Sequence, residues 1–205
     1  MSTSYSICKI FDDNWKLNVR RICKLTIQDT TLKGLVKALR RRHTYFAAKG
    51  AKASDHGLLE PYGLKIGQER VEQIFQQAYD KGEKFSLRSN ETKEFISYMM
   101  HKFCEMNQDK GMVTQIHYGA IRNANEYLFK NWGTDVGGDV SAENVNIIEN
   151  LQPLLTRFFS GEDNNQNHLI LYPMNQIFAH TNIMLERVFP RSILGFPGGI
   201  MILLM

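Results

Sequence analysis

The chain has little cysteine, little proline and no long apolar run, and these shortages exclude several classes of protein. Its three cysteines, Cys8, Cys23 and Cys104, are too few for a disulfide framework and show no C-x-x-C or C…H spacing of a zinc site. Residues 1–20 lack the apolar core of a signal peptide. The apolar stretch 193–205 has 13 residues, fewer than the ~20 that a membrane helix needs. We therefore expect a cytoplasmic protein with reduced thiols and no membrane partner.

The chain also lacks a strong charge of either sign. It has 25 Lys+Arg and 21 Asp+Glu, which leaves a net charge of +4 at pH 7. This excess is small, and its tightest basic cluster, residues 40–42, lies on a predicted helix as a solvated face, so we expect no nucleic-acid partner. The 43% of hydrophobic residues is typical of a globular protein, and 205 residues can bury a sizeable core.

Helical periodicity alternates with short strand-like runs along the sequence. Five helices are predicted: residues 32–46 ending at Gly50, 71–79 ending near Gly82, 95–106 between a cap at Ser89 or Asn90 and a stop at Gly111, 145–158 after a cap at Ser141, and 177–188 before Pro190. Four strands are predicted at residues 51–54, 112–117, 169–172 and 193–196. Trp132 and residues 133–138 are predicted as a loop.

Strands that alternate with helices predict βαβ units and a parallel sheet. The expected fold class is therefore α/β, an incomplete (β/α)₈ TIM-barrel-like arrangement of about four parallel strands with flanking helices, or else a small open sheet. No G-x-G-x-x-G or P-loop string follows any strand, which disfavours the nucleotide-binding open sheets. We expect one partial-barrel domain over residues 1–205.

Functional sites of α/β folds lie beyond the carboxyl ends of their strands, and polar side chains occur at these places. They are Asp55 and His56 after the first strand, His117, Arg122 and Asn123 at and after the second, and Tyr172 at the end of the third. Asp and His side chains serve as general acids and bases or as metal ligands, and Arg binds carboxylates in a bidentate fork.

Each of four candidates also has a structural alternative. Asp55 also suits a cap of the next segment, and His56 a loop histidine bonded to backbone. His117 follows an apolar strand, where a buried and hydrogen-bonded core histidine is common. Arg122 also suits an exposed position at the start of a helix.

The strings at these positions resemble a known family. They are S-D-H-G-L at 54–58, Q-I-H-Y-G-A-I-R-N at 115–123, G-T-D-V-G-G-D at 133–139 and L-I-L-Y at 169–172. In this order, and over residues 31–197, the chain is similar to the uronate isomerase (glucuronate isomerase) family of the amidohydrolase superfamily. It resembles a central fragment, at roughly the fourth to seventh strands of the family's barrel.

The resemblance implies an aldose–ketose isomerase, an intramolecular oxidoreductase of glucuronate catabolism. The family interconverts D-glucuronate with D-fructuronate, and D-galacturonate with D-tagaturonate, by proton transfer between C2 and C1. By resemblance, Asp55 and His117 are catalytic, with the acid and base roles unassigned. The residues His56, Arg122, Asn123 and Tyr172 are implied to bind substrate. The partner is a small-molecule uronate, the cofactor of the intact family is a divalent metal, zinc or manganese, and a homo-oligomer is possible.

The departures from the family pattern are as informative as the matches. The chain has no H-x-H pair and no T-D-S-R-like string, which supply the family's metal ligands, so we expect no metal ligand within this chain and little or no activity from it alone. Residues 198–205 read as an out-of-frame tail, because one lost base turns codons for Trp-Trp-His-Asn-Asp into Gly-Gly-Ile-Met-Ile. The alternative function is a non-catalytic, truncated module that interacts or self-associates through exposed strand edges. A different metal-dependent hydrolase of the superfamily is a weaker alternative, disfavoured by the Q-x-H-x-G-A-x-R string.

Overall fold

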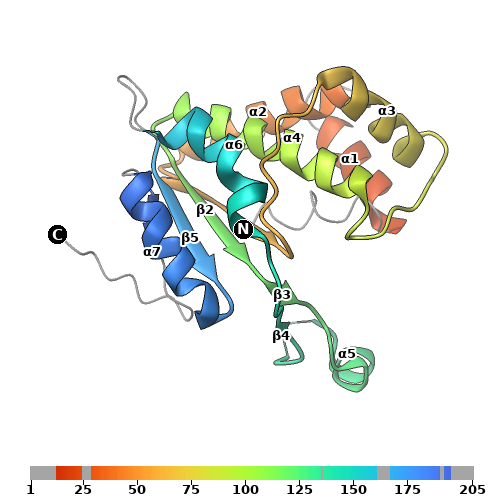
Figure 1. The fold of residues 1–205 in the computed structure, drawn as a ribbon. Helices are drawn as coiled ribbons and strands as arrows, with labels where there is room; N and C mark the ends of the chain where they lie inside the picture. Colours follow the sequence, from red (N-terminus) through yellow and green to blue (C-terminus); the bar gives the residue numbers. More distant parts are fainter. Residues whose placement is uncertain (1–12, 25–28, 135, 161–166, 190–191, 195–205) are drawn as a thin grey trace.

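The structure, a computed structural model, describes residues 13–24, 29–134, 136–160, 167–189 and 192–194 (Figure 1). The helices are α1 (Asp13–Lys24), α2 (Leu32–Ala48), α3 (Gln68–Tyr79), α4 (Asn90–Gln108), α5 (Glu126–Trp132), α6 (Ile147–Phe159) and α7 (Ala179–Val188), with a 3₁₀ turn η2 (Gln176–Phe178). The strands are β1 (Ala53–Leu58), β2 (Val113–Tyr118), β3 (Ala120–Ile121), β4 (Val140–Ser141), β5 (Leu169–Pro173) and β6 (Ser192–Leu194). Cys8 and the predicted tail at 198–205 lie outside the described residues.

The main sheet is parallel and has the order β1-β2-β5-β6. Each step along it is a βα crossover, with α3 and α4 between β1 and β2, and α7 between β5 and β6. The α/β fold with a parallel sheet is therefore confirmed. A closed barrel is not shown, because the two end strands of this sheet do not pair with each other in the described part of the chain.

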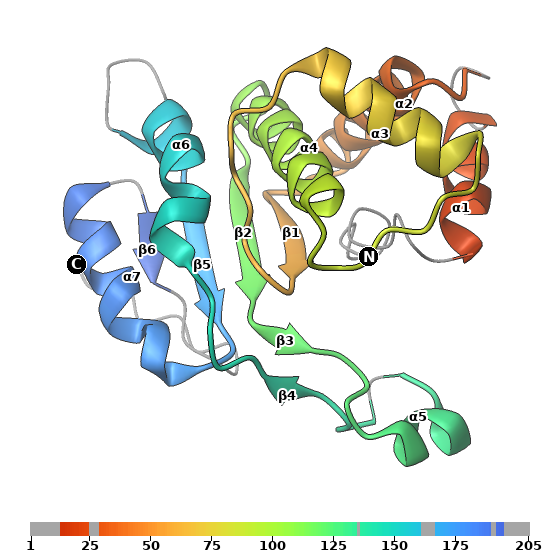
Figure 2. The same ribbon diagram turned by 45° about the vertical axis from the view of Figure 1, so that its right-hand side comes forward.

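Within the described part of the chain, helices cover one face of the sheet and none covers the other, which is called the uncovered face below (Figure 2). Side chains alternate between the two faces along each strand. In β1 and β2 the covered set includes the fully buried Thr114, Ile116 and Tyr118, whereas Asp55 and His117 belong to the other set and are partly exposed. The helix side of the sheet forms the core, in which the buried apolar residues make one cluster.

Local signals account for several helix limits. Thr31 caps α2 by accepting a hydrogen bond from Gly34 N–H, and Ser89 caps α4 by accepting one from Thr92 N–H. Gly111 follows α4 with φ +60°, a conformation that favours glycine. The predicted cap at Ser89 and stop at Gly111 are confirmed.

Three predicted limits are wrong. The first strand runs to Leu58 and not to residue 54. The helix α6 begins after Asn146, whose side chain accepts from Glu149 N–H, while the predicted cap Ser141 lies in β4. Trp132 belongs to the end of α5 and not to a loop.

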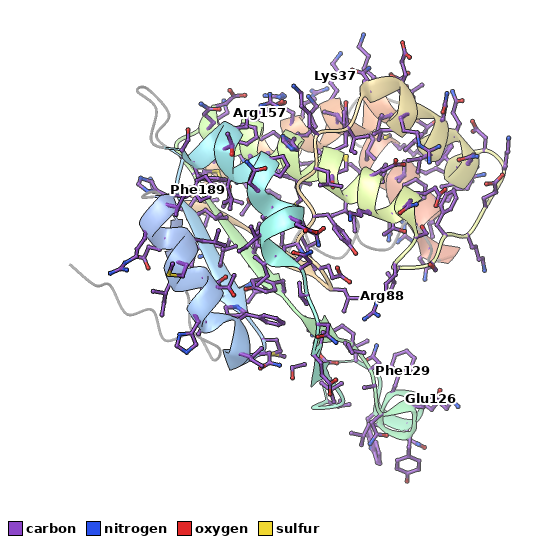
Figure 3. All side chains as sticks on the ribbon, in the orientation of Figure 1. Lys37, Arg88, Glu126, Phe129, Arg157 and Phe189 are labelled. Carbon is purple, nitrogen blue, oxygen red and sulfur yellow. The ribbon has the colours of Figure 1, made fainter. Side chains whose placement is uncertain are left out.

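An arm, residues 120–141, projects beyond the carboxyl ends of β1, β2 and β5 (Figures 1 and 2). It contains the antiparallel pair β3–β4 and the helix α5, which carries no buried residue. Glu126 and Phe129 mark this helix far from the body of the molecule (Figure 3). Among the described residues, no helix has the length and apolar character needed to cross a membrane.

Candidate active site

Three candidate side chains come together on the uncovered face of the sheet. Asp55 comes from β1, His117 from β2 and Tyr172 from β5. The register pairs Gly57 with His117 and His117 with Tyr172, so the three strands present these groups at the same edge. Because alternate residues share a face, Asp55 lies on the same side as Gly57 and within reach of His117.

The contacts among these three groups are close. His117 Nδ1 lies 2.6 Å from Asp55 Oδ1, and the His117 ring stacks on the Tyr172 ring with centroids 4.3 Å apart and planes 5° apart. The side chains of His117 and Asp55 are 50% and 37% exposed. A neutral imidazole that donates Nδ1–H to the carboxylate keeps Nε2 as an acceptor. The stacked phenol and the carboxylate thus fix the tautomer and the plane of a half-exposed base.

The surroundings of Asp55 and Tyr172 set the pKa of each group. Burial raises the pKa of Asp55, but the hydrogen bond from His117 and its charge act in the opposite direction, and the net pKa lies below the usual value. Asp55 is therefore a carboxylate at neutral pH. Burial and the charge of Asp55 both raise the pKa of Tyr172, which keeps this phenol neutral.

His56 lies on the opposite face of the sheet from this group. It is 1% exposed, its Nε2 is 2.9 Å from Ser54 Oγ, and its ring centroid is 4.7 Å from that of Phe103 on α4. Burial lowers the pKa of His56 to about 4, so it is neutral at pH 7. The predicted loop position of His56 is wrong because β1 continues to Leu58, and the alternation within a strand turns His56 away from Asp55.

Arg122 and Asn123 lie on the arm. Arg122 Nη1 donates to Asp139 Oδ2 at 2.7 Å, and the backbone N–H of Asn123 donates to Asp139 Oδ1 at 2.8 Å. Asn123 has φ +55°, a left-handed conformation that Asn tolerates better than most residues. An open hollow of about 620 Å³ borders this clasp, lined by Ala124, Asn125, Glu126 and the run 137–140. Asp139 therefore organises the arm, a role that its place in a Gly-rich string did not reveal.

Sequence reasoning also missed a buried polar network behind the sheet. Asn107 donates to Ser54 Oγ and to Thr114 Oγ1, and its own carbonyl lies 2.7 Å from His43 Nε2. The available signal was the occurrence of hydroxyl side chains at Ser54 and Thr114, which share the covered face of their strands with His56 and apolar or aromatic residues.

The residues present do not fit a complete metal centre. Within the described part of the chain, no three His, Cys, Asp or Glu side chains are grouped so that they could hold an ion. Asp55 and His117 offer two donor groups, and their facing atoms bond each other. A divalent metal commonly takes at least three protein ligands.

Comparison with known proteins identifies uronate isomerases as relatives of this chain. The family profile described as glucuronate isomerase matches residues 5–194. Uronate isomerase of Thermotoga petrophila is 35% identical over 186 residues, which cover 90% of this chain and 40% of that protein. Uronate isomerase of Bacteroides fragilis is 40% identical over 122 residues. The chain thus spans about 40% of the length of the first of these curated relatives.

Solved structures agree with this result. The crystal structure of uronate isomerase from Thermotoga maritima matches with a TM-score of 0.85 and 32% identity, over 94% of this chain and 41% of that one. Glucuronate isomerase from Caulobacter crescentus matches with a TM-score of 0.80 and 25% identity, over 93% of this chain and 38% of that one. Since the family profile covers far more than half of the sequence, the chain belongs to the glucuronate isomerase family.

Proposed function

We propose that this chain supplies the proton-transfer part of a uronate isomerase active site, which interconverts D-glucuronate with D-fructuronate and D-galacturonate with D-tagaturonate. The observation that carries the proposal is the Asp55–His117 pair, joined at 2.6 Å on the uncovered face of the sheet. Family membership supports the reaction class, and the pair supplies a chemical group that this reaction needs.

The reaction requires one carbon-bound proton to move between neighbouring atoms. A base removes the proton from C2 and leaves an enediolate anion, the O2 proton moves to O1, and the protonated base returns its proton to C1 as the C2 carbonyl forms. We assign the first and last steps to His117 Nε2, because Asp55 accepts a hydrogen bond from Nδ1–H and its negative charge stabilises the imidazolium that forms. Tyr172, a neutral phenol stacked on the ring, holds its plane.

We assign recognition of the substrate carboxylate to Arg122 and positioning to Asn123. Arg122 is 57% exposed on its side chain and already binds a carboxylate, Asp139. A uronate carboxylate has the same planar geometry and would compete with Asp139 for the guanidinium. The divalent metal that family resemblance implies, zinc or manganese, would need ligands from beyond the described residues, and no step above depends on it.

The test uses the full chain and a chimaera. The purified chain, with and without Zn²⁺ or Mn²⁺, is incubated with D-glucuronate and followed by NMR, and we expect no turnover above background. In the chimaera, residues 31–194 replace the matching segment of the Thermotoga maritima uronate isomerase. We expect the chimaera to turn over D-glucuronate, and the change His117→Gln to lower its kcat by about 10²–10⁴-fold, the usual contribution of a general base.

Two controls make the result specific to the pair. Asp55→Asn should lower kcat with a smaller effect on KM, because it removes the orienting carboxylate and leaves the imidazole in place. His180→Gln, an exposed histidine on α7, should leave both constants unchanged. A folded His117→Gln chimaera with undiminished kcat would refute the assignment.

A second candidate function is a module that self-associates. In the described part of the sheet, β1 and β6 are the end strands of the order, and each is paired on one side only. Unpaired strand edges are templates for association with another chain. This observation favours association whether or not the chain contributes to catalysis.

A further inference from the structure

One side-chain amide joins the two strands that carry the candidate pair. Asn107, in the last turn of α4, is fully buried. Its Nδ2 donates to Ser54 Oγ at 2.8 Å and to Thr114 Oγ1 at 2.7 Å. Ser54 in β1 and Thr114 in β2 are direct register partners, so both N–H groups of a single amide bridge one rung of the ladder.

The amide itself is held from the other side. His43, on α2, lies with its Nε2 2.7 Å from Asn107 Oδ1 and donates to it. The carbonyl is thereby occupied by α2, and both amide N–H groups are left to the strands. Ser54 Oγ, which accepts from Asn107, is also hydrogen-bonded to His56 Nε2 at 2.9 Å. All of these bonds lie on the helix side of the sheet; those to Ser54 and Thr114 are buried, and the one from His43 is partly buried.

The bridge lies directly behind the candidate site. Ser54 precedes Asp55, and Thr114 is three residues before His117 in the neighbouring strand. A slip of β1 by one residue would move Asp55 to the covered face, because side chains alternate with a period of two. In the described sheet β1 is an end strand, and β2 is its single neighbouring strand. The hydrogen bond from Asn107 on α4 to Ser54 is a further contact that can fix the register of β1.

We propose that Asn107 is a positioning residue that sets the register and spacing of β1 against β2, and so holds the Asp55 carboxylate against His117 Nδ1. This inference rests on the proposed function, which gives the Asp55–His117 pair its catalytic role. The contact between the two side chains can nevertheless be measured without turnover. Asn107 touches neither member of the pair, and it acts on them through Ser54 and Thr114.

The test measures the pair directly in the full chain. The pKa of Asp55 is followed by carboxyl ¹³C NMR, and the protonated nitrogen of His117 by ¹⁵N NMR. For Asn107→Leu we expect the pKa of Asp55 to rise, because burial, which raises it, is then no longer opposed by the hydrogen bond from His117. The Nδ1–H signal of His117 should be lost as well. Asn150→Leu is the matched control, since Asn150 is a buried asparagine on α6 whose amide reaches Glu60 instead of the two strands.

Two milder variants decide the question if Asn107→Leu does not fold. Ser54→Ala cuts the bridge at β1, and Thr114→Val cuts it at β2. Because either cut opens the same bridge, we expect each variant alone to change the Asp55 pKa as much as both together. Additive changes, or a folded Asn107→Leu with an unchanged Asp55–His117 pair, would overturn the proposal. If the NMR result holds while His117→Gln leaves the chimaera's turnover intact, the proposed function fails and the positioning inference stands.

Discussion

At the residue scale, His56 makes the stability of the fold sensitive to mild acid. Burial lowers its pKa to about 4 in the folded state, whereas an unperturbed histidine titrates near 6.5. As pH falls from about 6.5 to about 4, the unfolded chain binds a proton that the folded chain does not, and stability is lost. Between about pH 7.5 and pH 5 we expect a loss of about 2 kcal/mol in the free energy of unfolding, measured by urea denaturation.

The variant His56→Gln separates this effect from other titrations. Glutamine can keep the hydrogen bond to Ser54 but has no proton to gain, so the fall between these two pH values should shrink by most of that amount. His180→Gln, on the exposed side of α7, should keep the wild-type slope. Asp55 affects stability at lower pH than His56. Because its pKa is lowered in the folded state, its contribution to the free energy of unfolding is lost only as pH falls below the usual pKa of an aspartate. Equal slopes in wild type and His56→Gln would contradict the prediction.

The sequence placed Asp55, His117 and Tyr172 at one edge of a sheet, and the structure brings these three together. The reason differs from the predicted one, because Asp55 lies inside β1 and not after it. His56 could not be assigned to a face from the sequence. The strand A-S-D-H-G-L has polar residues on both of its faces, so its alternation is visible only once α4 is seen to cover one of them.

At the element scale, the loop before α3 is locked against α6 at Gly63. Its N–H donates to Asn150 O at 2.8 Å, and its carbonyl lies 2.9 Å from His101 Nε2. A Cβ at this position would lie 2.6 Å from Leu154 Cβ, inside van der Waals contact. We expect Gly63→Ala to lower the free energy of unfolding by about 1–3 kcal/mol through overpacking, measured by urea denaturation.

Gly138→Ala is the matched control for this change. A Cβ there would meet its nearest atoms at 3.8 Å, which is ordinary contact, and the position is in the arm. We expect an effect within about 0.5 kcal/mol, as for other substitutions away from tightly packed places. If both variants lose the same stability, the close approach of Gly63 to α6 is not the cause.

A buried stripe made some helices predictable from the sequence, although α1, which buries Trp15, Val19 and Cys23, was missed. The helices α3 and α4 bury Val71, Ile74 and Phe95 at helical spacing, and their periodicity is the signal that burial imposes. The helix α5 buries no residue, so no such signal exists. At α6, Ser141 and Asn146 are both good caps by residue type, and tertiary packing selects Asn146.

At the scale of the whole molecule, helix–strand alternation was enough to predict a parallel sheet but not its closure. Each βα unit is specified by local pattern, and short connections place neighbours side by side. Closure of the sheet depends on what the two end strands, β1 and β6, pair with. Such pairings join segments that are distant in the sequence, and a local pattern of helices and strands does not predict them. The partial exposure of Asp55 and His117 on the uncovered face follows from this arrangement.

The exposed apolar side chains outside the sheet predict that the isolated chain self-associates. Large apolar side chains are exposed in two places, on the arm (Tyr127, Phe129, Trp132) and along α7 and the turn before it (Ile177, Met184, Val188). A net charge of +4 gives only weak repulsion between copies. Contiguous exposed apolar groups and unpaired strand edges both favour contact with another chain. We expect sedimentation velocity to show an average mass that rises with protein concentration.

Charge placed on α7 should reduce that association if its apolar face is responsible. In the double variant Met184→Lys/Val188→Lys two exposed apolar groups become cations, which are costly to desolvate at an interface. Tyr127→Ser/Trp132→Ser removes the edge-to-face pair of the arm, whose ring centroids are 5.5 Å apart, and tests the second surface separately. Gln152→Lys adds a charge at an exposed polar position of α6 and serves as the control for charge alone. A wild-type chain that sediments as a monomer at every concentration would exclude both surfaces, whereas association lost only in the α7 variant would assign it to that helix.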